Sequence, residues 1–217
     1  MKAHDVRGFS LVELIVSVAI MVAVLAGVFH VVNPAYGIFE TELERIDMQQ
    51  RARVSADALV RDLIVAGAGA STPPVAPYRR GTSADPPGAV FADRISVAYT
   101  LPGSTPVIAT YTTRTDASGV SHLMRYDGDA SDLPVVDYVS GFDADYFDAA
   151  QRIGLDRFGD GPWVPDAVSL GRYDADLLSV RRIRLCFTIR PARALLSGRV
   201  ADHRFCVDVA PRNLNLP

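Results

Sequence analysis

The chain has 217 residues, of which 49% are hydrophobic and 22% charged, and its formal net charge at pH 7 is −3. A slightly acidic chain lacks the basic excess typical of nucleic-acid-binding proteins, so we expect no nucleic-acid partner. The length suffices for one long helix and one domain of ordinary size.

The longest apolar stretch lies at the start of the chain, over residues 9–32, and Glu13 is its one formal charge. At about 1.5 Å per residue, such a helix spans a hydrocarbon core of about 30 Å. No second run of this length follows, so we expect a single membrane crossing. Lys2 and Arg7 lie in the short leader, residues 1–8. By the positive-inside rule they predict a cytoplasmic amino terminus and an extracytoplasmic C-terminal domain.

The junction between the leader and the apolar run reads Gly8-Phe9-Ser10-Leu11-Val12-Glu13. It resembles the signature of type IV pilins and type II secretion pseudopilins, in which a basic leader ending in Gly precedes an aromatic residue and, shortly after, a Glu. The resemblance implies that a prepilin peptidase cuts between Gly8 and Phe9, and that Phe9 becomes the N-methylated first residue. The alternative is a simple membrane anchor that contains this string by chance.

In the mature chain, the resemblance implies an assembly role for Glu13. A carboxylate in lipid needs a partner, and in this family the partner is the charged amino terminus of a neighbouring subunit. At about 4 Å and an effective dielectric near 20, their attraction is about 4 kcal/mol. Before assembly, Glu13 has the alternative of snorkelling to the lipid headgroups. The implied partners are therefore inner-membrane lipid and other major and minor pilins or pseudopilins.

Outside the membrane, residues 33–69 are expected to continue the helix. Asn33-Pro34 predicts an interruption, because Pro34 has no N–H group and disfavours helical geometry at Asn33. Apolar residues then recur at helical spacings, and we expect residues 54–65 to form the face on which a sheet packs. Gly67 and Gly69 are expected to end the helix.

The remainder of the chain, residues 70–217, is predicted to form an antiparallel β-sheet domain. A Pro-rich loop covers residues 70–88, a hairpin turn is expected at residues 116–119, and one strand is expected to bend or bulge at Gly141. The strand-like stretches are residues 94–101, 107–113, 122–126, 135–147, 180–189 and 205–209. A long N-terminal helix packed on such a sheet is an α+β fold, which is also the plan that the pilin resemblance implies.

Parts of the body of the chain look like PilW-like minor pilins. The similar stretches are residues 51–53, 59–63 and 66–67 at the end of the helix, and residues 180–185 and 209–214 near the end of the chain. They favour a minor subunit over a major pilin, which is normally shorter. The pseudopilin J of type II secretion shares the same general plan.

The two cysteines predict a pairing of the last two strands, residues 180–190 and 202–209, in a hairpin about residues 195–198. If Cys186 faces Cys206, one register aligns apolar and oppositely charged residues at the same time. The further pairs are Leu185 with Val207, Phe187 with Phe205, Arg184 with Asp208, and Arg190 with Asp202. Because the compartment permits disulfides, we predict a Cys186–Cys206 bond; two free, half-buried thiols are the alternative.

Candidate ligand and catalytic groups are sparse. Asp156, Asp160 and Asp166 lie in a Gly-rich loop and are weak candidates for Ca²⁺ ligands, but their spacing matches no EF-hand and acidic loops are usually only solvated. The histidines show no metal-binding spacing. No nucleophile motif or Gly-rich phosphate loop is present, so we expect neither a cofactor nor an enzyme.

The sequence favours a minor type IV pilin, held in the inner membrane by its helix until it enters a pilus filament or primes its assembly. Two alternatives remain. One is a type II secretion pseudopilin that acts in protein export. The other is a membrane-anchored extracytoplasmic binding domain that never assembles.

Overall fold

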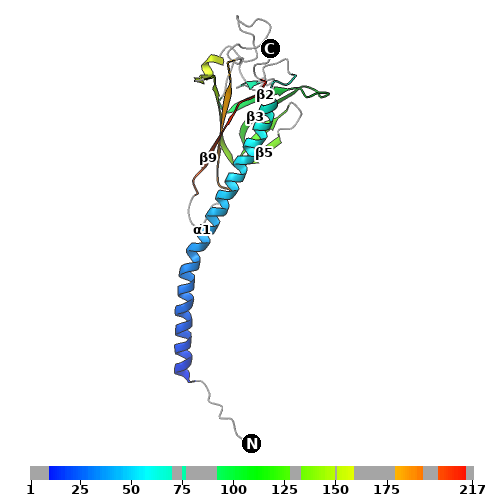
Figure 1. Cartoon of the computed structure of the whole chain (residues 1–217). Helices are drawn as coiled ribbons and strands as arrows, with labels where there is room; N and C mark the ends of the chain where they lie inside the picture. The colour runs from blue at the N-terminus through cyan, green and yellow to red at the C-terminus, as the bar shows by residue number, and fades with distance from the viewer. Residues whose placement is uncertain are drawn as a thin grey trace.

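The computed structural model describes residues 10–69, 75–76, 92–127, 133–149, 151–158, 179–192 and 200–213. These ranges contain one long helix, α1, a short 3₁₀ turn, η1, and nine β-strands. The C-terminal part of α1 packs against two antiparallel sheets (Figure 1). The predicted α+β layout is therefore confirmed.

Helix α1 covers Leu11–Val65, and its first half protrudes from the sheet domain as a stalk (Figure 1). It contains a window that is long and apolar enough to cross a membrane, and no residue of that window is buried. The first buried residue of α1 is Glu44. The described part of the domain therefore leaves the apolar part of α1 uncovered.

The expected interruption at Pro34 is wrong, because α1 continues through this residue. Proline removes one helical N–H donor and clashes with the carbonyl group one turn earlier, at a cost of about 3 kcal/mol. The 55 residues of α1 supply unbroken hydrogen bonding on both sides of Pro34. A long helix can therefore retain a proline that would end a short one.

The C-terminal end of α1 is fixed against the neighbouring strand. The Gly67 N–H donates to the Ala98 carbonyl at 2.9 Å, and the Thr100 N–H donates to the Ala68 carbonyl at 2.7 Å. Gly67 and Gly69 have φ angles of 83° and 60°, which favour glycine. A Cβ atom on Gly69 would lie 2.9 Å from the Thr100 carbonyl oxygen. The two glycines therefore end the helix as predicted.

The first sheet has five strands in the order β1-β2-β3-β4-β5. Its members are β1 Val75–Ala76, β2 Arg94–Tyr99, β3 Val107–Thr115, β4 Ser121–Tyr126 and β5 Leu133–Asp137. The predicted turn between β3 and β4 is present, and the Asp116 carboxylate accepts the N–H groups of Ser118 and Val120, each at 2.9 Å. In this turn, a side-chain carboxylate and not a backbone carbonyl group accepts these two N–H groups.

The second sheet has four strands in the order β7-β6-β8-β9. Its members are β6 Val139–Phe147, β7 Arg152–Ile153, β8 Arg182–Ile189 and β9 His203–Val209, and η1, Leu155–Phe158, follows β7.

The single strand predicted over residues 135–147 is instead divided at Tyr138. Its φ angle of 62° lies in the left-handed region, which turns the chain. Strand β5 therefore ends in the first sheet and β6 begins in the second. The predicted irregularity near Gly141 is present, as a register shift between Val139 and Gly141 opposite β8. A period-two pattern reports which face of a strand is buried, not which sheet the strand joins.

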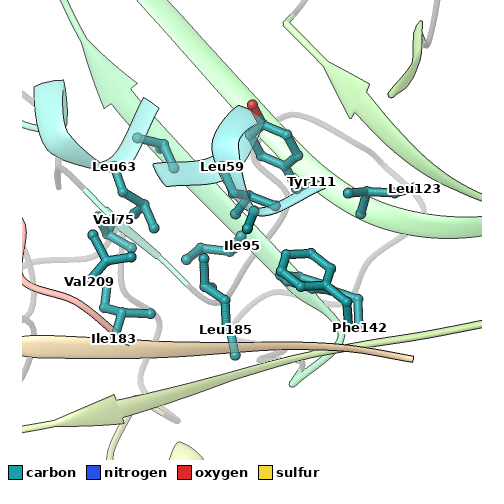
Figure 2. Close-up of a cluster of buried hydrophobic side chains, with 14 of the residues drawn as sticks. Leu59, Leu63, Val75, Ile95, Tyr111, Leu123, Phe142, Ile183, Leu185 and Val209 are labelled. Carbon is teal, nitrogen blue, oxygen red and sulfur yellow. The ribbon is translucent and has the colours of Figure 1, made fainter. Parts of the chain in front are cut away.

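The hydrophobic core lies between α1 and the two sheets (Figure 2). Leu59 and Leu63 of α1 are fully buried there. The largest buried side chains around them include Ile95, Tyr111 and Leu123 from the first sheet, and Phe142, Ile183 and Leu185 from the second.

The prediction for residues 54–65 holds for only one face of the helix. Leu59 and Leu63 are buried, whereas Val54 and Ile64 are 46% and 45% exposed. The buried face begins earlier than expected and includes Met48. The helical period rotates neighbouring apolar residues to different sides, so an apolar stretch alone does not identify the packed face.

Candidate functional site

The candidate functional site is the uncovered part of α1. Large apolar side chains from Leu11 to Val32 are between 37% and 73% exposed. A continuous apolar surface of this length is unfavourable in water and marks a membrane or protein contact. The helix is therefore suited to lie in lipid or against other helices.

Glu13 lies in the first turn of α1 and is exposed. The Ser17 hydroxyl donates to the Glu13 backbone carbonyl at 2.8 Å, so this bond does not use the carboxylate. Within the described ranges, no side chain pairs with that carboxylate. Its assembly role stays a prediction. Gly8 and Phe9 lie outside the described residues, and so do Asp160 and Asp166.

The helix is attached to the first sheet through Asp62, which lies on its buried face. The Asp62 carboxylate accepts hydrogen bonds from Tyr99 at 3.3 Å, from Tyr111 at 2.8 Å and from the Arg125 Nε at 3.1 Å. Arg125 also donates to Asp127 at 3.0 Å. A buried charge is tolerated when it is paired and hydrogen-bonded. This Asp62 cluster therefore joins α1 to β2, β3 and β4.

The protonation of the Asp62 cluster follows from its surroundings. Burial, and after it the negative charge of Asp62, raises the pKa of the Tyr99 and Tyr111 hydroxyls. Both hydroxyls therefore stay protonated and act as donors at neutral pH. For Arg125, partial burial is the largest single influence and lowers the pKa, but the charge and hydrogen bonding of Asp62 and Tyr111 together outweigh it, so the net shift is upward.

A second attachment joins α1 to the second sheet. The Glu44 carboxylate, which is buried, accepts the Ala192 N–H at 2.5 Å. Arg51 forms an ion pair with Asp47, and its guanidinium lies 4.9 Å from the centre of the Tyr138 ring. The helix is thus held at the corner between β5 and β6 and beyond the end of β8. Together with the Asp62 cluster, these contacts attach the domain to two separate positions along the helix.

The pairing of β8 with β9 follows the predicted register. Cys186 faces Cys206, and Leu185 and Phe187 face Val207 and Phe205. The Arg184 Nε lies 2.8 Å from the Asp208 carboxylate, and the Arg190 Nε lies 3.5 Å from that of Asp202. A disulfide joins Cys186 to Cys206, whose Cα atoms are 4.1 Å apart.

Other titratable groups on the surface make structural contacts. The His122 ring lies between two carboxylates, with Nδ1 2.8 Å from Asp137 and Nε2 3.2 Å from Asp116. The bond to Asp137, followed by that to Asp116, raises the pKa of His122 above 6.5. When protonated, the ring therefore ties the β3–β4 turn to β5. Asp156 lies in η1, and no group of three or more His, Cys, Asp or Glu side chains in the described ranges is placed to hold a metal ion.

Comparison with known proteins bears on the helix. Residues 4–29 match the family described as the prokaryotic N-terminal methylation motif. The chain carries the methylation motif of type IV pilin-like proteins. No curated protein and no solved structure gives a significant match. The pilin-like motif supports a type IV pilin or pseudopilin-like protein, processed by a prepilin peptidase and anchored through its apolar helix. It also favours a structural over a catalytic protein, whereas the PilW-like resemblance of the body stays a prediction.

No role for the Asp62 cluster was predicted from the sequence. The sequence does contain one indication of the cluster. Asp62 lies three residues after Leu59 and next to Leu63, within the apolar stripe of a helix. A carboxylate in that position needs partners in the folded protein. The identity of those partners, Tyr99 and Arg125 among them, depends on how the strands are ordered in the sheet.

Proposed function

We propose that this pilin-like chain is a minor type IV pilin, which is cleaved after Gly8, methylated at Phe9, and then built into a pilus filament or used to prime its assembly. One observation carries this proposal. The methylation motif leads directly into an apolar helix, and the first half of that helix is not covered by any described part of the chain.

Such a helix needs two environments, one before and one during assembly. Before assembly, lipid covers the apolar side chains and the chain lies in the inner membrane, with residues 9–32 as the membrane-spanning segment. During assembly, helices of neighbouring subunits replace the lipid, and Glu13 pairs with the charged amino terminus of an adjacent subunit. The domain formed by residues 70–217 then lies on the outside of the filament.

The attachment of the domain to the helix suits a subunit that moves as one body. The Asp62 cluster and the Glu44–Ala192 bond connect α1 to both sheets. Because paired, buried polar groups are costly to separate, the domain would keep its position on the helix when the helix leaves the membrane. This property supports a filament subunit and is less informative about an anchored domain that stays in place.

The processing step is tested by intact-mass analysis of protein purified from its native membrane. The expected species begins at N-methyl-Phe9. Substituting Gly8→Leu should block cleavage, because the peptidase must approach a backbone that carries no side chain. The matched control is His4→Leu, which places the same side chain elsewhere in the leader and should leave cleavage unchanged. Retention of Met1 in cells with an active prepilin peptidase would contradict the proposal.

Incorporation is tested by shearing surface filaments and detecting this chain beside the major pilin. Its presence in the sheared fraction supports the pilin role. Normal cleavage with absence from filaments, together with loss of protein export when the gene is deleted, would instead identify a type II secretion pseudopilin. An anchored binding domain would be indicated if blocking cleavage changed neither phenotype.

A further inference from the structure

His122 of β4 lies between two carboxylates that come from different parts of the first sheet. Its Nδ1 atom is 2.8 Å from the Asp137 carboxylate of β5, and its Nε2 atom is 3.2 Å from the Asp116 carboxylate of the β3–β4 turn. A neutral imidazole has one N–H donor, so its second nitrogen would direct a lone pair at a negative charge. Only the imidazolium form donates to both carboxylates. The two contacts together therefore require a proton on the ring.

The Asp116 carboxylate is held in place independently of the histidine. Its Oδ1 atom accepts the Ser118 N–H, the Ser118 hydroxyl and the Val120 N–H at 2.9, 2.7 and 2.9 Å, while its Oδ2 atom faces His122. The hydrogen bond from the Ser118 hydroxyl, followed by those from Val120 and His122, lowers the pKa of Asp116 to about 2. Asp116 therefore stays charged wherever a histidine titrates.

The other charges near the ring do not replace these two carboxylates. Arg114 faces His122 from β3 and has the same charge as the imidazolium, but it is exposed to solvent, which weakens the repulsion. Strand β6 also packs against β4, and its acidic residues, Asp143 and Asp145, form ion pairs with arginines of the second sheet. Helix α1 lies on the opposite face, since Leu123, the residue after His122, is buried in the core (Figure 2). Within the described ranges, two negative charges and one positive charge thus face the ring.

The contact with Asp137 reaches the place where the two sheets and the helix meet. Tyr138, the next residue, has the left-handed φ of 62° at which β5 is followed by β6. Its carbonyl accepts the Arg190 N–H at 2.9 Å, and its ring lies 4.9 Å from the Arg51 guanidinium of α1. We call Tyr138 with these two contacts the corner. A left-handed tyrosine persists only where its surroundings hold it, so the corner depends on how firmly β5 is held.

We propose that His122 is a proton-controlled clamp, which in its protonated form joins the β3–β4 turn to β5 and tightens the corner, and which loosens the corner when it loses the proton. This inference goes beyond the proposed pilin role and does not depend on it. Its direction follows from the two carboxylates. The bond to Asp137, followed by that to Asp116, raises the pKa of His122 above 6.5. The clamp therefore contributes fully below pH 6.5, and its contribution is lost as the pH rises through the pKa of the folded chain.

The test is hydrogen–deuterium exchange of the full-length chain in detergent, at about pH 5.5 and about pH 8.5, on either side of histidine titration. The results are expressed as protection factors, which removes the intrinsic effect of pH on exchange. We expect the amides of β5 and the Arg190 amide of the corner to lose protection about fivefold at the higher pH, because a partly exposed ion pair is lost. Equal protection at both pH values would overturn the proposal. A loss confined to β5, with the Arg190 amide unchanged, would overturn the coupling to the corner.

Two substitutions at His122 separate its charge from its side chain. His122→Gln carries no charge and should show the low protection at both pH values. His122→Arg stays charged and can donate to both carboxylates, so it should show the high protection at both. The matched control is His203→Gln, which removes the other histidine of residues 70–217 and should keep the full pH dependence. A pH dependence that survives in His122→Gln, or that disappears in His203→Gln, would overturn the assignment to His122.

A second measurement needs no substitution at the histidine. In an NMR titration of the full-length chain, the His122 ring should titrate above pH 6.5, and Asp137→Asn should lower that midpoint. A midpoint at or below 6.5 in the unaltered chain would overturn the proposal. These measurements do not use filaments. The clamp and the pilin role can therefore fail separately, because only the pilin role predicts this chain in the sheared fraction.

Discussion

Removal of the Asp62 carboxylate should destabilise the domain by separating α1 from the first sheet. In Asp62→Ala, Tyr111 keeps one acceptor, the Ala58 carbonyl at 3.2 Å, and Arg125 keeps Asp127 at 3.0 Å. The Tyr99 hydroxyl and the Arg125 Nε lose the acceptor described above. Each unsatisfied buried group costs about 1–3 kcal/mol. Because the Arg125 side chain is 23% exposed and water can reach part of it, we expect a total loss of about 3 kcal/mol.

The measurement is urea unfolding of the full-length chain in detergent, followed by a signal from the sheet domain. Asp57→Ala is the matched control, because Asp57 is exposed on the same helix. The two substitutions share the gain in helix propensity that accompanies Asp→Ala. Their difference in unfolding free energy therefore isolates the hydrogen bonds of Asp62.

A difference below about 1 kcal/mol would refute this reasoning, since it would equal the loss of a single ordinary hydrogen bond. It would mean that water or a local rearrangement satisfies Tyr99 and Arg125 at little cost. In a thermal scan, the expected difference corresponds to a lowering of Tm by about 6–12 °C for a protein of this size.

The other predictions concern the disulfide, the membrane helix and high pH. Replacing both Cys186 and Cys206 by Ala should lower the unfolding free energy by about 3 kcal/mol, because the bond closes a loop with a sequence separation of 20; unchanged urea midpoints would contradict this. Glu13→Ala should insert into the membrane normally but be depleted from sheared filaments, and normal incorporation on blots would show that the carboxylate is dispensable. The raised pKa of buried Tyr111 predicts a stability contribution that is complete below pH 10.0 and falls above it, because the Tyr111 hydroxyl loses its proton first in the unfolded chain. Tyr111→Phe should reduce this alkaline loss in unfolding curves recorded on either side of that pH.

Much of the fold follows from local sequence patterns. The unbroken apolar run predicts the exposed first half of α1, and the positions of Gly67 and Gly69 predict its end. The register of β8 and β9 is also predictable, because apolar, charged and cysteine pairs all agree on one alignment. In each case the residues that decide the structure are neighbours along the chain or along one hairpin, so local pattern and tertiary environment give the same answer.

The division at Tyr138 and the Asp62 cluster were decided only by the tertiary structure. A tyrosine adopts a left-handed φ only when the surrounding structure compensates the cost. Asp62 finds its partners on three different strands, which are distant in sequence and meet only once the first sheet is ordered. Local sequence patterns indicate which backbone conformation and which degree of burial each residue favours. The two sheets around α1 determine which of those preferences are met, because burial and pairing energies arise only when distant segments come into contact.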